Sequence, residues 1–137
     1  MTDREIIARR AIAALNEEDW ETLTDCIHPE MRLTQPVPDV GQTEYESYVG
    51  TYHGREEAVA ILKRFAEEAQ ELQIEFRRTE TVGDDALLYE FVWLIGPEAR
   101  QSAQLAWGLS RFREGRVVSS SIFSTEDAAR AAIARGT

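Results

Sequence analysis

Apolar residues recur along the chain with two different periods. In the first half they recur at helical spacing, and in the second half they alternate at every second position. Residues 2–5 have the spacing of a capping box, which predicts that a first helix begins near Thr2. Asp19 is placed to cap a second helix that does not continue past Pro29, and Gly54 precedes a third. The pattern predicts helices first and sheet afterwards.

Four long strands are predicted in the second half of the chain. They span 72–82, 86–95, 103–113 and 117–124, and turn signals such as Gly83-Asp84 and Gly96-Pro97 separate them. A short strand is predicted at 31–35, and a closing helix at 126–135, after Ser124 or Thr125. Antiparallel strands that follow helices indicate one α+β domain over residues 1–137, in which the helices cover one face of the sheet.

The segment 36–53 has no clear periodicity. It contains Pro36, Pro38, Gly41 and Gly50, together with three tyrosines. A segment of this length without secondary structure of its own is usually functional or locally ordered. We therefore interpret 36–53 as a flap over one end of the core.

Both faces of the predicted sheet carry large apolar side chains. One face packs on the helices, and the other leaves in water the residues Leu88, Val92, Leu105, Trp107 and Leu109. A monomer seldom leaves such a patch uncovered. We therefore predict a homodimer formed through this outer face. The alternative is that the closing helix folds back over the same face.

Composition narrows the classes of partner. The chain has 137 residues and a net charge of -10, which opposes binding to nucleic acid or anionic lipid. Cys26 is the only cysteine, so neither an intrachain disulfide nor a cysteine metal cluster is possible. No histidine spacing indicates a metal, no cofactor motif is present, and no apolar run is long enough to span a membrane. We expect a cytoplasmic protein without metal or cofactor.

Four short motifs carry a resemblance to a known family. They are Ala-Leu-Asn-Glu-Glu-Asp-Trp at 14–20, His-Pro-Glu at 28–30, Tyr-His-Gly-Arg-Glu at 52–56 and Arg-Phe-Arg-Glu-Gly-Arg-Val at 111–117. In this order and spacing the chain resembles the SnoaL-like branch of the nuclear-transport-factor-2-like superfamily. The resemblance implies a cone-shaped sheet wrapped around the helices, with a pocket at the wide end and frequent dimers. Its members include polyketide cyclases, ketosteroid isomerases, limonene epoxide hydrolases, dehydratases and proteins without catalytic activity.

The best-known catalytic residues of these branches have no counterpart here. Gln35 stands at the position that resembles the isomerase general base, and the two oxyanion donors fall near Ala11 and Gly108. The epoxide-hydrolase Arg-x-Asp pair is absent; 78–80 is the nearest substitute. The last strand offers serines where the cyclase branch uses an acid.

The resemblance, combined with the strand alternation, points one set of side chains into the pocket. The predicted lining consists of Leu33, Gln35, Tyr89, Phe91, Trp93, Gln104, Ser110, Ser119, Ser121 and Phe123. For Phe91 and Phe123 the simpler interpretation is plain core. Tyr89 and His53 are the candidate catalytic residues, because His53 could serve as an acid or base; a structural role for this histidine near a helix start is the alternative.

Three functions stay open at this point. The first is a cofactor-independent cyclase, isomerase or dehydratase acting on a polyketide-, steroid- or terpenoid-like ligand. The second is a protein that binds such a ligand without catalysis, which the vacant catalytic positions favour. The third is an interaction module that works through its dimer surface.

Overall fold

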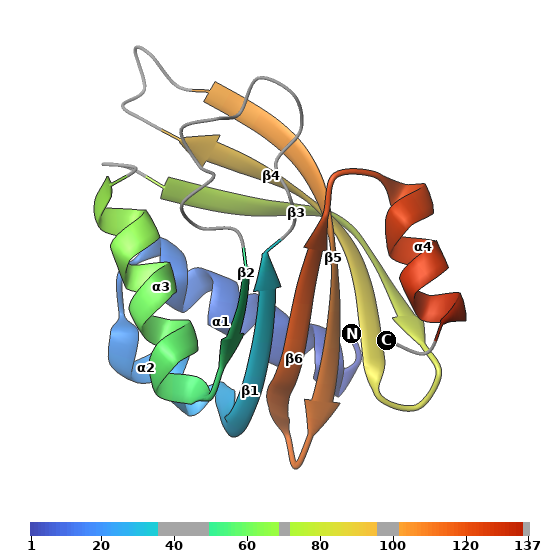
Figure 1. Cartoon of the computed structure of the whole chain (residues 1–137), viewed down its shortest axis with the longest axis horizontal. Helices are drawn as coiled ribbons and strands as arrows, with labels where there is room; N and C mark the ends of the chain where they lie inside the picture. Colours follow the sequence, from blue (N-terminus) through green and yellow to red (C-terminus); the bar gives the residue numbers. More distant parts are fainter. Residues whose placement is uncertain (36–49, 69–71, 96–101, 136–137) are drawn as a thin grey trace.

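The computed structural model describes residues 1–35, 50–68, 72–95 and 102–135. These residues form helices and strands in the predicted order, with one additional strand (Figure 1). The elements are α1 (Asp3–Asn16), α2 (Trp20–Asp25), β1 (Ile27–Gln35), β2 (Gly50–His53), α3 (Arg55–Glu68), β3 (Leu72–Val82), β4 (Ala86–Ile95), β5 (Ser102–Arg113), β6 (Arg116–Phe123) and α4 (Glu126–Ala134).

All six strands belong to one bent, unclosed sheet with the order β2-β1-β6-β5-β4-β3. Strands β1 and β6 pair in parallel, and every other neighbouring pair is antiparallel. Helices α1, α2 and α3 lie on the concave side, and α4 lies on the opposite side (Figure 1). The predicted α+β architecture is confirmed, although the helices cover both faces and not one. None of the helices in the described ranges is long and apolar enough to cross a bilayer.

Side-chain caps explain where three of the helices begin. The hydroxyl of Thr2 accepts a hydrogen bond from the backbone N–H of Glu5. Asp19 caps α2 in the same way, and Thr125 caps α4. Each cap satisfies an N–H that has no partner inside the helix, so the short polar residue fixes the first turn.

The first sheet edge differs most from the prediction. Strand β1 begins at Ile27, not at residue 31, and residues 50–53 form β2 against it. The parallel pairing of Ile27 with Val117 supports this early start, and the local pattern around Pro29 does not reveal it. The flap interpretation is therefore wrong for 50–53, while residues 36–49 lie outside the described part of the chain.

Register shifts occur on β1 between Ile27 and Arg32, on β3 and on β6, and the last two are β-bulges that change which side chains face the helices. Arg77 is the extra residue between the paired positions Phe76 and Arg78 of β3. Val118 is the extra residue of β6, because Phe112 pairs with Val117 and Arg111 pairs with Ser119. An extra residue on one strand moves every later side chain to the other face.

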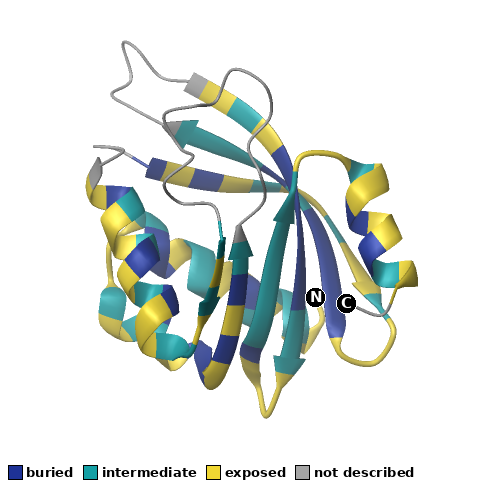
Figure 2. Cartoon of the chain, viewed as in Figure 1, coloured by how far each residue is buried: buried dark blue, intermediate teal, exposed yellow. Residues whose placement is uncertain are grey.

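Helix α4 covers most of the outer apolar patch. Ala129 packs on Leu88 and Trp107, and Ala132 packs on Leu109. The side of α4 that faces the sheet is buried and its other side is exposed (Figure 2). Three of the five residues predicted at a dimer interface are therefore buried within the monomer, because the closing helix folds back over this face.

Charged side chains hold α4 in place. Arg130 forms ion pairs with Glu80 of β3 and with Glu126 of its own helix, at 3.2 Å and 2.8 Å. Hydrogen bonding from Arg130 lowers the pKa of the Glu80 carboxyl, and both carboxylates raise the pKa of Arg130. Arg78 also lies over the Trp107 ring at 5.1 Å from its centroid. These exposed contacts orient the helix, whereas its apolar contact with Leu88, Trp107 and Leu109 removes large side chains from water.

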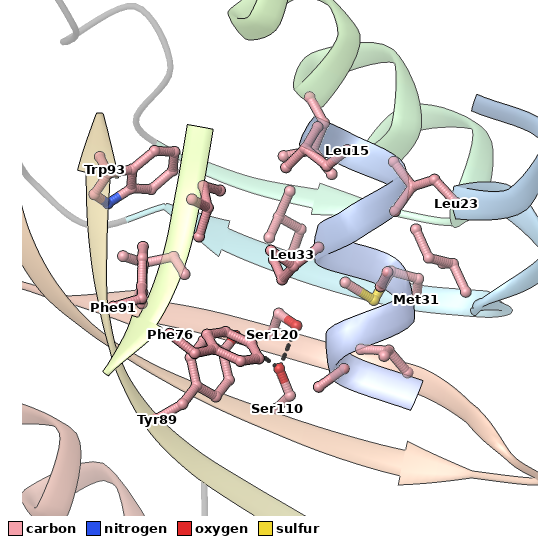
Figure 3. Close-up of a pocket in the computed structure, with 18 residues that line it drawn as sticks. Leu15, Leu23, Met31, Leu33, Phe76, Tyr89, Phe91, Trp93, Ser110 and Ser120 are labelled. Carbon is pink, nitrogen blue, oxygen red and sulfur yellow. Dashed lines mark hydrogen bonds between the residues drawn. The ribbon is translucent and has the colours of Figure 1, made fainter. Parts of the chain in front are cut away.

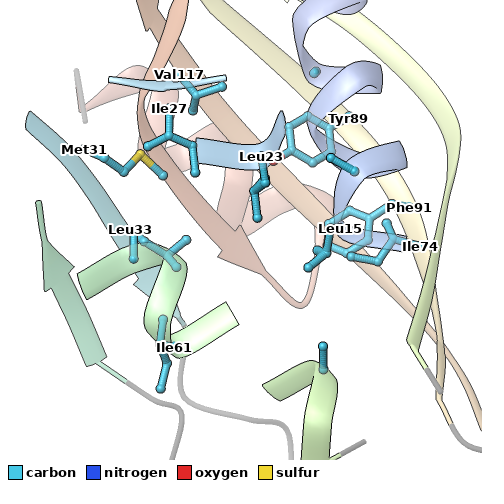
Figure 4. Close-up of a cluster of buried hydrophobic side chains, with 14 of the residues drawn as sticks. Leu15, Leu23, Ile27, Met31, Leu33, Ile61, Ile74, Tyr89, Phe91 and Val117 are labelled. Atoms are coloured by element: carbon cyan, nitrogen blue, oxygen red, sulfur yellow. The ribbon is translucent and has the colours of Figure 1, made fainter. Parts of the chain in front are cut away.

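The main core lies between the concave face of the sheet and the first three helices. Its buried side chains come from all of these layers, including Leu15, Leu23, Ile27, Met31, Leu33, Ile61, Ile74, Phe91 and Val117 (Figure 4). Burying each large side chain contributes about 1.5–3 kcal/mol relative to exposure. This core also forms the walls of the candidate site.

Candidate functional site

An apolar cavity of about 100 Å³ lies between α1 and the concave face of the sheet. Helices α2 and α3 and strands β1, β3, β4, β5 and β6 complete its walls (Figure 3). The lining residues are Ala8, Ala11, Ile12, Leu15, Leu23, Ile27, Met31, Leu33, Leu62, Ile74, Phe76, Tyr89, Phe91, Trp93, Ser110, Val117, Ser120 and Ile122. An apolar lining with a few polar groups is typical of a small-molecule site.

Three hydroxyl groups form the polar part of the cavity wall. Ser110 lies in the centre, 2.9 Å from the Tyr89 hydroxyl and 2.8 Å from the Ser120 hydroxyl. Figure 3 shows the three oxygen atoms as a short chain that crosses from β4 over β5 to β6. Ser110 and Tyr89 are both buried, so this hydroxyl chain is held inside the protein.

The position of the Tyr89 ring depends on the residue opposite it. Tyr89 pairs with Gly108 across β4 and β5, and the ring lies over this glycine. A Cβ atom at position 108 would lie 2.7 Å from the Tyr89 oxygen and still closer to two ring carbons. Glycine therefore leaves the space through which Tyr89 reaches Ser110 on the next strand.

Burial widens the pH range over which Tyr89 stays protonated. Desolvation raises the pKa of its phenol, and the nearby hydroxyls of Ser110 and Ser120 oppose that shift. The ordinary pKa of 10.0 already leaves a phenol protonated at neutral pH, and the upward shift extends this protonated range further into alkaline pH. Tyr89 is thus a neutral hydroxyl that can donate or accept a hydrogen bond.

Aromatic rings continue the wall beyond the hydroxyl chain. The ring centroids of Phe76 and Tyr89 are 5.0 Å apart, and those of Tyr89 and Phe91 are 5.6 Å apart. Phe91 in turn contacts Trp93 at 5.3 Å, and Phe65 meets Trp93 edge to face at 5.3 Å. These contacts restrict the rings to defined positions and give the cavity one flat aromatic side.

The structure places five of the predicted lining residues around this cavity. They are Leu33, Tyr89, Phe91, Trp93 and Ser110. Gln104 pairs with Trp93 across β4 and β5, so it shares the concave face but does not line the cavity. The side chain of Gln35 lies outside the described part of the structure.

The prediction for β6 has the wrong phase. Uniform alternation from Val117 points Ser119, Ser121 and Phe123 inward, but the extra residue Val118 reverses the order. Ser120 and Ile122 line the cavity instead. Phe123 packs against α4 on the outer face, and Ser121 pairs with Leu109 of that face.

Sequence reasoning also missed the helical side of the cavity. Ala8, Ala11, Ile12 and Leu15 of α1 line it, together with Leu23 of α2. The apolar stripe of α1 was visible in the sequence, but such a stripe does not show whether it packs against other side chains or lines a cavity.

His53 does not belong to the apolar cavity. Tyr52 packs on the core, so the next residue of β2 points to the opposite face. His53 is exposed and lines a separate open depression of about 630 Å³ with Glu30, Arg32, Asp85, Arg111, Phe112, Arg113, Val118 and Ser119. Within the described ranges, no group of three or more potential metal ligands occurs.

Comparisons with solved structures identify the fold. An NTF2-like protein of unknown function from Burkholderia pseudomallei superposes with a TM-score of 0.74 at 21% identity, covering 95% of this chain and 97% of that one. TerC crystallised with polyporic acid gives 0.75 at 14% identity, covering 97% and 99%. A loop-truncation variant of IdmH gives 0.71 at 21% identity, covering 94% and 98%.

Comparisons of sequence identify the family. No curated protein matches the chain at a significant level. The model of the SnoaL-like domain family matches residues 8–120, which run from within α1 to within β6, the last strand along the chain. The match agrees with the resemblance found in the sequence and with the NTF2-like fold. The chain therefore belongs to the SnoaL-like domain family.

Proposed function

We propose that the chain binds a hydrophobic small molecule in the cavity and positions one of its oxygen atoms at Tyr89, Ser110 and Ser120. The observation that carries this proposal is a hydroxyl chain buried in an otherwise apolar wall. Two hydrogen bonds use two of the three hydroxyl hydrogens, so one hydrogen is left for an acceptor on the ligand. A carbonyl or phenolic oxygen on an apolar skeleton matches this arrangement.

The size of the cavity limits how much of the ligand it holds. Its volume of about 100 Å³ is below the roughly 300–1,000 Å³ of most ligand pockets. An apolar cavity of about 150 Å³ accommodates benzene, so a ring that enters this smaller cavity requires its walls to move outward. We propose that one ring of a polyketide-, steroid- or terpenoid-like compound enters beside the aromatic wall. TerC, a protein of the same fold, was crystallised with polyporic acid.

The reaction class that we propose is a cofactor-independent isomerisation, cyclisation or dehydration. Such reactions develop negative charge on a carbonyl oxygen, and a preorganised hydroxyl donor stabilises that charge. Tyr89 can supply this donor because its phenol is protonated at neutral pH. Its donation to the ligand oxygen is the catalytic role proposed for this chain.

A second function, binding without catalysis, is favoured by a different observation. No carboxylate or imidazole lines the cavity among the residues that the structure describes. Proton abstraction needs a base, and a protonated phenol is a poor one. The two functions therefore differ in whether a base reaches the ligand.

Isotope exchange separates the two functions. Cyclic ketones incubated with the protein in deuterium oxide exchange their α-protons if a base acts on them, which proton NMR follows. We expect exchange that depends on protein concentration and that falls with Tyr89→Phe. Ligand binding without any exchange would favour the non-catalytic protein.

The indole N–H signals of two tryptophans can report whether a ligand binds in the cavity. The chain contains three tryptophans; Trp93 lines the cavity, and Trp107 lies under α4 on the other face. A bound ligand is expected to shift the indole N–H signal of Trp93 and to leave that of Trp107 unchanged. Equal shifts of both signals, or none, would contradict binding in the cavity.

We also propose a homodimer, formed through a smaller part of the outer sheet face than the sequence predicted. Helix α4 leaves Val92, Leu94 and Leu105 of the outer face uncovered, and Leu105 is 53% exposed. We expect sedimentation equilibrium to show a dimer that Leu105→Glu dissociates. A wild-type chain that stays monomeric at high micromolar concentration would remove the dimer.

A further inference from the structure

We propose that the outer face of the sheet binds a small oxyanion, a phosphate or carboxylate group, in the depression around Arg32 and Ser119. This site is separate from the proposed ligand cavity, since the two share no lining residue. It goes beyond the function proposed above and does not depend on it.

Strand register brings the binding groups into one row. His53 of β2 pairs with Arg32 of β1, Arg32 pairs with Ser119 of β6, and Ser119 pairs with Arg111 of β5. Paired residues on neighbouring strands point to the same face, and the strands are about 4.8 Å apart. An oxyanion between Arg32 and either neighbour is therefore within reach of two donors at once.

The bulge at Val118 creates this arrangement. Met31 and Leu33, the two neighbours of Arg32 on β1, both line the inner cavity. Arg32 therefore points outward. Without the extra residue in β6, Ser119 would keep the inward phase of Val117. The bulge thus places a hydroxyl next to an arginine on the outer face.

The local charge differs in sign from that of the chain. Two of the three arginines in the depression are paired: Arg111 with Asp85 at 3.0 Å, and Arg113 with Glu30. Arg32 has no hydrogen-bond or ion-pair partner within the described ranges, so its positive charge is left over. The depression thus holds three arginines against two carboxylates, in a protein with a net charge of -10.

The chemistry of these groups matches an oxyanion. A guanidinium offers a fork of N–H donors that fits two oxygens of a phosphate or carboxylate. Ser119 adds a hydroxyl donor, and a ring nitrogen of His53 adds an N–H. The ion pairs Arg111–Asp85 and Arg113–Glu30 occupy the other two guanidinium groups, which leaves Arg32 for an added anion.

Isothermal titration with inorganic phosphate at constant ionic strength, with chloride as the balancing anion, tests the proposal. We expect saturable binding at one site per chain, weakened about tenfold in Arg32→Gln because a charge-assisted hydrogen bond is lost. Arg77→Gln is the matched control, since Arg77 is an exposed arginine on β3 at the other edge of the sheet. A parallel titration with acetate shows whether phosphate or carboxylate is preferred.

The proposal is overturned if neither anion binds saturably, or if Arg32→Gln and Arg77→Gln weaken binding equally. His53→Gln and Ser119→Ala provide independent variants in case Arg32→Gln perturbs folding, which circular dichroism reports. Each is expected to weaken phosphate binding severalfold, whereas Ser121→Ala leaves it unchanged. Wild-type affinity in both His53→Gln and Ser119→Ala would also overturn it.

Discussion

The ring of Tyr89 lies over the backbone of Gly108, its cross-strand partner, and occupies the space that a side chain there would fill. This contact lets the phenol extend from β4 over Gly108 and reach Ser110, on the same strand as Gly108, at 2.9 Å. The position of Tyr89 in the cavity wall therefore depends on the lack of a side chain at position 108.

Gly108→Ala is expected to destabilise the fold and to displace Tyr89 from Ser110. Overpacking of this kind costs about 1–3 kcal/mol of the free energy of unfolding, which urea denaturation measures. In a Tyr89→Ala background the same substitution is expected to cost far less, because the ring is gone. Additive costs in the double variant would show that the ring and position 108 do not interact.

Stability is expected to fall at alkaline pH through Tyr89. The pKa of the folded phenol is raised above its ordinary 10.0, so the unfolded state releases this proton first as pH rises. The contribution is complete below about pH 10 and is lost as pH rises toward the folded pKa, with a slope of up to about 1.4 kcal/mol per pH unit.

Tyr89→Phe isolates this effect from the other groups that titrate in the same range. We expect the difference in free energy of unfolding between wild type and Tyr89→Phe to be constant from pH 7 to 9 and to shrink above pH 10. A difference that stays constant up to pH 11 would contradict a raised pKa.

The bulge in β6 predicts opposite results for two adjacent serines. Ser120→Ala removes the hydrogen bond to Ser110 and is expected to cost about 1 kcal/mol of stability. It also weakens binding of an oxygen-bearing ligand severalfold, with no effect on a hydrocarbon analogue. Ser121→Ala, on the outer face, is the control and changes neither quantity; the reverse pattern would place the bulge elsewhere.

The packing of α4 predicts a similar contrast along one helix. Ala129 is fully buried against Leu88 and Trp107, whereas Ala128 is exposed. Ala129→Asp places a carboxylate against apolar side chains and is expected to destabilise by about 2–4 kcal/mol and to promote self-association. Ala128→Asp is expected to stay within about 0.5 kcal/mol of wild type. Equal effects, measured by denaturation and sedimentation, would show that α4 does not cover this face.

The sequence alone determined the helices, their caps and the four long strands. Capping residues such as Thr2 and Asp19 act within one turn, and the alternation along β3 and β4 is a local pattern. Such interactions involve residues that are close together in the sequence, so they can be predicted without knowledge of the fold. The same patterns identified Tyr89, Phe91 and Trp93 as one inward-facing aromatic face.

Tertiary structure decided the rest of the site. A single extra residue, Val118, exchanged the roles of Ser119 and Ser120, because the phase of a strand depends on its partner. Folding of α4 onto the sheet decided whether Leu88 and Trp107 face a partner or the chain itself. Pairing of β1 with both β2 and β6 aligned Arg32 with His53 and Ser119, which lie far apart in the sequence. These outcomes depend on contacts between distant segments, and no local period encodes them.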